Sequence, residues 1–181
     1  MEKCFRFVIV QNRETQFDAP LYALMHAGAL SSFQVIYTEH SQAAVRDEET
    51  GLSPQWDHLS CESYPTRVLR RTSAWAMVKL AFQLRRQKPQ LVLICGYYPS
   101  CHLWLALALR LLGQRIGLRS DNTLCHTNLI GYRGRLRRLT VGPIQRLFHT
   151  WHPVGDQAHA YLRELSGAER PSYRFAYAVD I

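Results

Sequence analysis

Asp121 is the acidic side chain of this sequence that is best placed for proton-transfer chemistry. It stands in the run RSDNT of residues 119–123 and is the only acid within residues 110–146. A carboxylate in such a loop can orient a substrate hydroxyl or take its proton, and the neighbouring Asn122 can contact the same hydroxyl. Two structural roles stay open for Asp121, a helix cap and an ion pair with Arg119.

A second group of polar side chains lies in residues 11–17, which read QNRETQF and follow a short apolar run. Asn12, Arg13 and Gln16 can donate hydrogen bonds to a sugar or a phosphate, and the helix that follows has an N-terminus that favours anions. The segment has no glycine, so it is not the dinucleotide-binding fingerprint, in which glycines let the backbone approach a pyrophosphate. A solvent-exposed turn is the alternative interpretation.

Two aromatic residues and a glycine extend the list of candidate binding residues. Tyr97 and Tyr98 stand in the run GYYPS of residues 96–100, where their rings can stack on a sugar or a base. Packing of both tyrosines against neighbouring helices is the alternative. Gly155 follows the predicted strand at residues 150–154, and a residue without a side chain lets a ligand come close to the backbone there.

The cysteine and histidine spacing does not indicate a metal site. Cys101-His102 and Cys125-His126 are adjacent pairs, whereas zinc ligands are usually spaced, as in C-x-x-C. We therefore expect no metal and no cofactor bound by this chain. The five cysteines are an odd number without paired spacing, which predicts free thiols and a reducing compartment.

Positive charge is concentrated in one part of the chain. The 181 residues have a formal net charge of +8, and residues 110–146 hold eight of the 22 basic residues. A predicted basic helix at residues 135–148 places Arg135, Arg137 and Arg138 among aliphatic residues, which is typical of a helix that contacts an anionic membrane or a phosphate. A docked helix with solvated arginines is the alternative, and nucleic acid is the less favoured partner.

Composition and patterning predict a packed α/β protein. Hydrophobic residues make up 47% and charged residues 20%, which excludes a disordered tail or a disulfide-stapled miniprotein. Short β-rich runs alternate with helical ones. We predict strands at residues 5–11, 33–38, 91–95, 116–119, 150–154 and 173–179. We predict helices from the cap Asp18 to Gly28, at 73–87, 102–112 and 135–148, and from the cap Asp156 to Gly167. The expected fold is Rossmann-like, a mostly parallel sheet with helices on both faces.

This fold predicts where a ligand binds. Open parallel sheets bind ligands beyond the carboxyl ends of their strands. We therefore expect five loops to meet along one edge of the sheet, namely residues 11–17, those from 39 onward, 96–100, 120–127 and 154–156.

The order of these segments resembles the N-terminal half of a glycosyltransferase of family 4, which has the GT-B fold. The similar segments are residues 5–24, 90–113, 116–124 and 152–181. In that family a late strand ends in a glycine, a helix with Tyr-Leu follows, and a short strand runs into a Val-Asp pair. The corresponding residues here are Gly155, Tyr161, Leu162, Val179 and Asp180.

The resemblance implies an acceptor-binding domain that faces a donor-binding domain across a cleft. The complete enzyme would transfer a sugar from a sugar nucleotide to a glycan or lipid-linked acceptor, with retained anomeric configuration and without a metal. In this chain Asp121 and Asn122 would contact the reacting hydroxyl, Asn12, Arg13 and Gln16 would line the cleft, and Tyr97 and Tyr98 would shape the acceptor pocket. Arg135, Arg137 and Arg138 would face the membrane or the pyrophosphate of a lipid carrier.

We expect residues 1–181 to form a single N-terminal domain without the C-terminal donor domain, so its partner would be a donor-binding domain or chain. The apolar run 7–10 is too short for a signal peptide, and the GYYPS turn interrupts the longest apolar region, so we expect a cytoplasmic protein able to associate with the inner face of the plasma membrane. Two other functions stay open. One is a non-catalytic recruiting subunit of a two-chain transferase, and the other is a flavodoxin-like nucleotide-binding regulatory domain.

Overall fold

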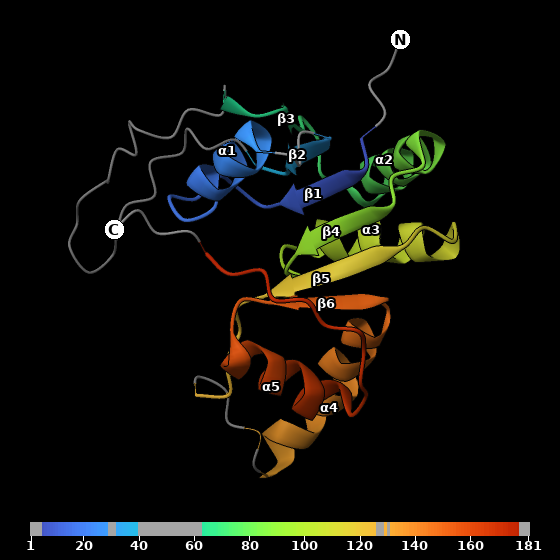
Figure 1. The fold of residues 1–181 in the computed structure, drawn as a ribbon. Coiled ribbons are helices and arrows are strands. Elements are labelled where there is room, and N and C mark those ends of the chain that lie inside the picture. Colours follow the sequence, from blue (N-terminus) through green and yellow to red (C-terminus); the bar gives the residue numbers. More distant parts are fainter. Residues whose placement is uncertain (1–4, 29–31, 40–62, 126–128, 130, 178–181) are drawn as a thin grey trace, which may run out of the picture.

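The computed structural model describes residues 5–28, 32–39, 63–125, 129 and 131–177. Six strands form one sheet in the order β3-β2-β1-β4-β5-β6, and every neighbouring pair is parallel (Figure 1). The strands are β1 (Phe7–Gln11), β2 (Phe33–Tyr37), β3 (Thr66–Val68), β4 (Leu91–Cys95), β5 (Ile116–Ser120) and β6 (Thr150–Pro153). The predicted Rossmann-like α/β fold is confirmed.

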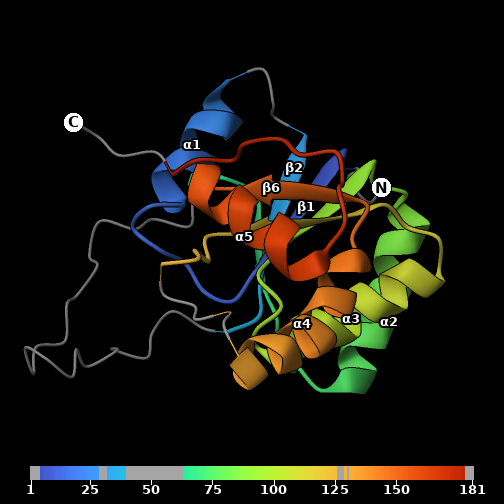
Figure 2. The ribbon, with the colours of Figure 1, turned by 90° about the horizontal axis from the view of Figure 1, so that it is seen from below.

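Five helices connect and cover these strands. They are α1 (Ala19–Ala27), α2 (Ala74–Gln87), α3 (Ser100–Leu111), α4 (Gly131–Arg146) and α5 (Asp156–Ser166). Helix α1 lies on one face of the sheet and α2 and α3 on the other, while α4 packs against α5 near β6 (Figure 2). Helices on both faces are therefore confirmed.

The central strands contribute to two apolar cores because their side chains alternate between the two faces. In β4, Val92 and Ile94 pack on the side of α2 and α3, whereas Leu93 packs on the side of α1. In β1, Val8 and Val10 likewise face one core and Ile9 the other. Burial on both faces explains why these strands read as continuous apolar runs rather than as alternating ones.

Local signals in the sequence fix several element ends. The Ser73 hydroxyl accepts a hydrogen bond from the Ala76 backbone N–H and so caps α2. Lys88 ends the same helix in a left-handed conformation, directly before Pro89. Gly167, with a φ of 58°, ends α5 in the same conformation, which glycine adopts without strain.

The structure departs from the sequence prediction in several element details. The short edge strand β3 was not predicted, and helix α4 begins at Gly131 rather than at residue 135. Asp156 is the first residue of α5 rather than its cap, a position that Gly155 takes. Residues 40–62 of the predicted long loop lie outside the described residues.

The predicted last strand at residues 173–179 is only partly a sheet element. Within the described residues, a single bridge joins Ser172 to Trp151 of β6. Backbone hydrogen bonds from Trp151 N–H to the Pro171 carbonyl and from Phe175 N–H to the Pro153 carbonyl still hold the chain beside β6. We call residues 171–177 the strap, because they run along the edge of the sheet toward the carboxyl ends of the strands (Figure 1).

Candidate functional site

A pocket of about 460 Å³ opens at the carboxyl ends of β1, β4, β5 and β6. Six of the predicted site residues line it, namely Asn12, Arg13, Tyr97, Tyr98, Asp121 and Asn122. They come from three loops that are far apart in the sequence and that the parallel sheet brings to one edge. The strap completes the wall with Tyr177.

Two of the residues predicted to bind the acceptor do not line this pocket. Gln16 is exposed and lies outside the lining, and at the last strand Val154 lines the pocket in place of Gly155. The Gly155 backbone is extended, with a φ of −159°, and a Cβ atom there would meet no protein atom within 4 Å. The structure around Gly155 thus leaves room for a side chain, and its predicted ligand contact stays a prediction.

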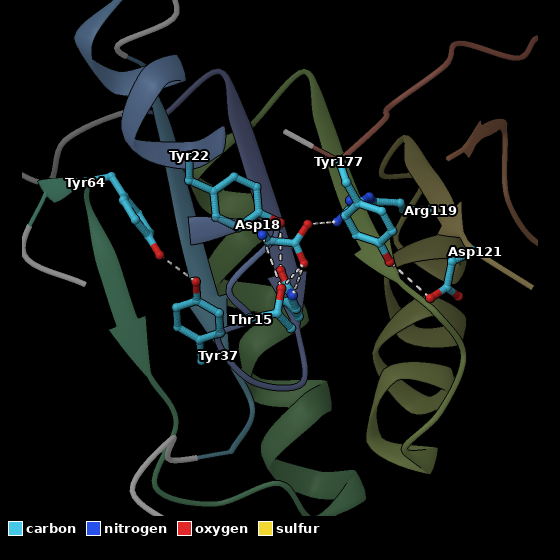
Figure 3. Close-up of polar contacts among 9 residues, drawn as sticks. Thr15, Asp18, Tyr22, Tyr37, Tyr64, Arg119, Asp121 and Tyr177 are labelled. Atoms are coloured by element: carbon cyan, nitrogen blue, oxygen red, sulfur yellow. Dashed lines mark hydrogen bonds and ion pairs between the residues drawn. The ribbon is translucent and has the colours of Figure 1, made fainter. Parts of the chain in front are cut away.

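Asp121 contacts a hydroxyl group in the pocket. The Tyr177 hydroxyl donates a hydrogen bond to Asp121 Oδ2 at 3.1 Å (Figure 3). Burial, and then the nearby Asp121 carboxylate, raise the pKa of Tyr177 to about 12, so the phenol keeps its proton and remains the donor. A carboxylate that accepts a hydrogen bond from a neutral hydroxyl is in the arrangement that a general base requires.

Arg119 forms an ion pair with Asp18 rather than with Asp121, the alternative that the sequence left open. Arg119 Nη1 lies 2.6 Å from Asp18 Oδ1, and both side chains are at most 5% exposed. Asp18 therefore does not cap α1 with its side chain, although it occupies the N-cap position. Its Oδ2 instead accepts a hydrogen bond from Gln11 Nε2 at 2.6 Å. It also accepts one from the Thr15 hydroxyl at 2.7 Å (Figure 3).

Tyr22 of α1 extends the hydrogen bonds around this ion pair. The Tyr22 hydroxyl donates to Gln11 Oε1 at 2.7 Å. Burial, followed by the nearby Cys95 and Asp18, raises the pKa of Tyr22. Burial raises the pKa of the Cys95 thiol to about 11 as well, so the thiol beside Arg119 is uncharged. The buried site therefore contains one cation and one anion surrounded by neutral donors.

Two of the three guanidinium nitrogens of Arg119 take no part in the ion pair with Asp18. Nε and Nη2 are buried and have no hydrogen-bond partner among the described residues. The guanidinium carbon lies 4.8 Å from the ring centroids of Phe175 and of Tyr177, both on the strap. The strap thus brings two aromatic rings against the cation that lines the pocket.

Sequence reasoning missed Arg119 and Asp18 as site residues. Asp18 has the position of a helix cap, so its presence in the sequence was explained without a role in the site. The available signal was the alternation in β5, where Ile116 and Leu118 belong to one core and Arg119 therefore points to the other face. A charged residue inside a buried strand requires a partner, and that partner stands about 100 residues earlier in the chain.

A buried histidine positions two of the pocket loops. His102 contacts the Gly96 carbonyl through Nδ1 at 3.2 Å and the Thr38 hydroxyl through Nε2 at 3.3 Å. Thr38 in turn lies 3.2 Å from Asn12 Oδ1. Burial lowers the pKa of His102, so the ring is neutral and donates only once, to the Gly96 carbonyl, which can only accept. His102 therefore connects the loops after β1 and β4.

The three predicted arginines of α4 lie in different environments. Arg137 Nη2 donates to the Tyr161 hydroxyl at 3.1 Å, and that hydroxyl lies 3.4 Å from the Tyr97 hydroxyl. Arg138 forms an ion pair with Glu164 of α5. Arg135 is exposed. Two of the three arginines thus attach α4 to α5, and Arg137 also links α4 to a pocket residue.

An exposed apolar stripe accompanies these arginines. Tyr132, Leu136 and Leu139 lie three or four residues apart, hence on one side of α4, and are 79%, 47% and 73% exposed. Arg133 and Arg135 are exposed beside them. No helix in the described part of the chain is long and apolar enough to cross a membrane.

Metal-binding chemistry finds no candidate in the described part of the chain, where no three His, Cys, Asp or Glu residues gather in a group that could hold an ion. Cys95, Cys101 and Cys125 are free thiols. His126, a member of one predicted Cys-His pair, lies outside the described residues, as do Val179 and Asp180.

Comparison with known proteins supports the fold of the chain. No protein-family model and no curated sequence matches it. Among solved structures, it is similar to a UDP-N-acetylglucosamine 2-epimerase from Rickettsia bellii, with a TM-score of 0.50 and 12% identity. It is also similar to a protein from Listeria monocytogenes assigned as a UDP-N-acetylglucosamine 2-epimerase, with a TM-score of 0.54 and 12% identity.

The chain covers less than half of each neighbour. It aligns over 87% and 90% of its own length, but over 41% and 42% of theirs. These epimerases share the GT-B fold with the glycosyltransferases of family 4. At 12% identity the comparison shows the fold, and the function of this chain must be argued from its own residues.

Proposed function

We propose that this chain is the acceptor-binding half of a retaining, sugar-nucleotide-dependent glycosyltransferase that acts in glycan, polysaccharide or glycolipid synthesis. The observation that carries the proposal is Asp121, a carboxylate that accepts a hydrogen bond from a hydroxyl inside a pocket at the carboxyl ends of the strands. The GT-B fold of the structural neighbours supports a partner domain or chain that binds the sugar nucleotide.

In this proposal the acceptor hydroxyl takes the place of the Tyr177 hydroxyl beside Asp121. The carboxylate orients that hydroxyl and takes its proton as the glycosidic bond forms, while the bond between the sugar and the nucleotide phosphate breaks and the nucleotide leaves. Asn122, Asn12 and Arg13 supply donors around the reacting group, and Tyr97 and Tyr98 offer aromatic surface to the acceptor ring. Tyr98 is 82% exposed, which leaves its ring free for such a contact.

The test is Asp121→Asn in the complete transferase, with this chain and its donor-binding partner together. The amide keeps the shape of the side chain but is a much weaker base, so we expect kcat to fall about 100-fold or more with little change in the acceptor KM. Asp156→Asn is the matched control, because Asp156 is exposed and lies outside the pocket. An unchanged kcat for Asp121→Asn would remove Asp121 from the chemistry.

A second candidate is a non-catalytic subunit that recruits the acceptor for a separate enzyme. The isolated chain should give no turnover of labelled sugar nucleotides under either proposal. A recruiting subunit predicts that Asp121→Asn weakens acceptor binding and leaves kcat unchanged. Tight nucleotide binding by the isolated chain would instead favour a flavodoxin-like regulatory domain.

We also propose that α4 places the chain on the inner, anionic face of the plasma membrane. The exposed stripe of Tyr132, Leu136 and Leu139 can enter the lipid boundary while Arg133 and Arg135 contact acidic head groups. Flotation with acidic vesicles should weaken with salt and with Leu139→Gln. Leu111→Gln on α3 is the control, since Leu111 is 80% exposed but lies on another helix. Equal flotation with neutral vesicles would contradict the role of the arginines.

A further inference from the structure

Arg119 has an unused hydrogen-bonding edge, which is unusual for a buried cation. Its side chain is 5% exposed, and its ion pair with Asp18 uses Nη1 alone. Nε and Nη2 have no hydrogen-bond partner among the described residues. Buried polar groups without partners destabilise a protein, and they are rare unless a ligand or function requires them.

The two free nitrogens share one edge of the planar guanidinium group. In arginine, Nε–H and the outer N–H of Nη2 point in parallel and match the spacing of two oxygens in a carboxylate or a phosphate. Asp18 occupies the other side of the group and holds it in place at 2.6 Å. The arrangement therefore leaves a preorganised edge with the geometry for one oxyanion.

The described groups of the protein around this edge do not supply a second anion for Arg119, which leaves the edge for a charged ligand. Arg119 lines the 460 Å³ pocket together with Arg13. The nearby Cys95 is an uncharged thiol, because burial raises its pKa to about 11. Asp121, the other acid of the pocket lining, is held by the Tyr177 hydroxyl at 3.1 Å. Neither group supplies the oxyanion that Nε and Nη2 lack.

The strap packs against the guanidinium group that carries this edge. The rings of Phe175 and Tyr177 lie 4.8 Å from the guanidinium carbon. The Tyr177 hydroxyl donates a hydrogen bond to Asp121, and its ring also lies 5.4 Å from the ring of Phe17. A ligand that replaced Tyr177 would gain both the carboxylate of Asp121 and the free edge of Arg119.

We propose that the Nε and Nη2 edge of Arg119 binds an oxyanion of the acceptor, a carboxylate or a phosphate, which displaces Tyr177. The inference rests on the proposed acceptor-binding function and narrows it to acidic acceptors. The hydroxyl that reacts at Asp121 and the oxyanion at Arg119 would belong to the same molecule, because both groups contact the one side chain of Tyr177. Uronic acids and phosphorylated sugars or lipids have this combination of groups.

The test measures binding to the full chain by calorimetry at constant ionic strength. The ligands are inorganic phosphate, glucuronate and, as the neutral control, glucose. We expect phosphate or glucuronate to bind saturably, and the tighter of the two identifies the source of the oxyanion. The double variant Asp18→Asn with Arg119→Gln should weaken that binding at least about ten-fold, since it removes a charged hydrogen-bonding group without leaving an unpaired charge.

Two further variants make the result specific. Arg163→Gln with Glu169→Gln removes an exposed ion pair elsewhere and should leave oxyanion binding unchanged. Tyr177→Ala removes the side chain that must be displaced and should tighten binding about two- to ten-fold, the factor that corresponds to one net hydrogen bond. The absence of oxyanion binding in wild type and Tyr177→Ala would overturn the proposal. Unchanged binding in the Asp18 and Arg119 double variant, or unchanged or weaker binding in Tyr177→Ala, would overturn it as well.

Failure of this inference and failure of the proposed function give different results. If the complete transferase glycosylates neutral acceptors and the Asp121→Asn variant does not, while no oxyanion binds, the function stands and the acidic subsite is wrong. If oxyanions bind as expected and Asp121→Asn leaves transfer unchanged, the subsite stands and the role of Asp121 in transfer is wrong.

Discussion

The buried ion pair between Asp18 and Arg119 allows a quantitative test of how this site is built. Asp18→Ala removes the anion and, with it, the carboxylate oxygen that accepts a hydrogen bond from Arg119 Nη1 at 2.6 Å. It also removes the acceptor for Gln11 and Thr15. Because the guanidinium then stays buried without compensation, we expect the free energy of unfolding to fall by about 3–5 kcal/mol.

An exposed ion pair of the same chain provides the matched control. Arg163 and Glu169 are 56% and 77% exposed, against 5% and 3% for Arg119 and Asp18. Water compensates the exposed charges when one partner is lost, so Glu169→Ala should cost about 0–1 kcal/mol. The contrast between the two alanine variants measures burial rather than the mere presence of an ion pair.

The assay is urea unfolding of the full chain, followed by circular dichroism. The double variant Asp18→Asn with Arg119→Gln should lose less stability than Asp18→Ala, since it leaves no buried charge unpaired. An Asp18→Ala variant that stays within about 1 kcal/mol of wild type would refute the reasoning, because solvent or another group would then be compensating the cation.

Two further predictions concern the sheet edge and the helix packing. Burial lowers the pKa of His152 to about 4 from its usual 6.5, so its contribution to stability is full above pH 6.5 and declines as the pH falls toward 4. Over that interval the free energy of unfolding of the wild type should fall by about 2–3 kcal/mol more than that of His152→Gln. Parallel pH profiles of the two proteins in urea unfolding would contradict this. At Gly142 a Cβ atom would lie 2.7 Å from the Leu165 carbonyl oxygen, so Gly142→Ala should force α4 away from α5 and destabilise the chain by about 1–2 kcal/mol in thermal unfolding. Gly155→Ala is the control, because its Cβ atom meets no protein atom within 4 Å, and it should change the stability by less than about 0.5 kcal/mol.

Much of the fold follows from local sequence signals. The residues of β4 were predicted with the observed bounds because they form a short apolar run between Pro89 and a Gly-Tyr turn. Helix α2 has a serine cap and an apolar stripe, which together define its start and its buried face. Strand β3 was missed because it is three residues long and lies at the sheet edge, where its side chains are partly or fully exposed and no apolar period marks it.

The sequence predicted which loops form the site, but not the hydrogen bonds and the ion pair that connect their residues. Six pocket residues were found because the carboxyl ends of parallel strands meet, a property of topology that needs no side-chain detail. The partners of Asp18 and Asp121 could not be found in this way. Each contact joins residues more than 50 positions apart, and it depends on which side of a strand or strap a single side chain takes.

The strand order explains why the cation and the anion of the buried pair meet at this edge. The chain runs outward from β1 to β3 and then returns to β4, so the sheet changes direction between β1 and β4, where such folds open a crevice. Asp18 follows β1, Arg119 is the residue before the last of β5, and β4 lies between these two strands. Neighbouring strands are about 4.8 Å apart, so a side chain must cross roughly 10 Å over the end of β4.

Small residues at the end of β4 make that crossing possible. Cys95 is paired with Arg119 in the sheet register, and Gly96 follows it with a φ of 77°, a turn conformation that glycine adopts without strain. A larger side chain at Cys95 would fill the path that the arginine takes to reach Asp18. The residues that turn the chain away from β4 therefore also provide the space in which the pocket and its buried cation are formed.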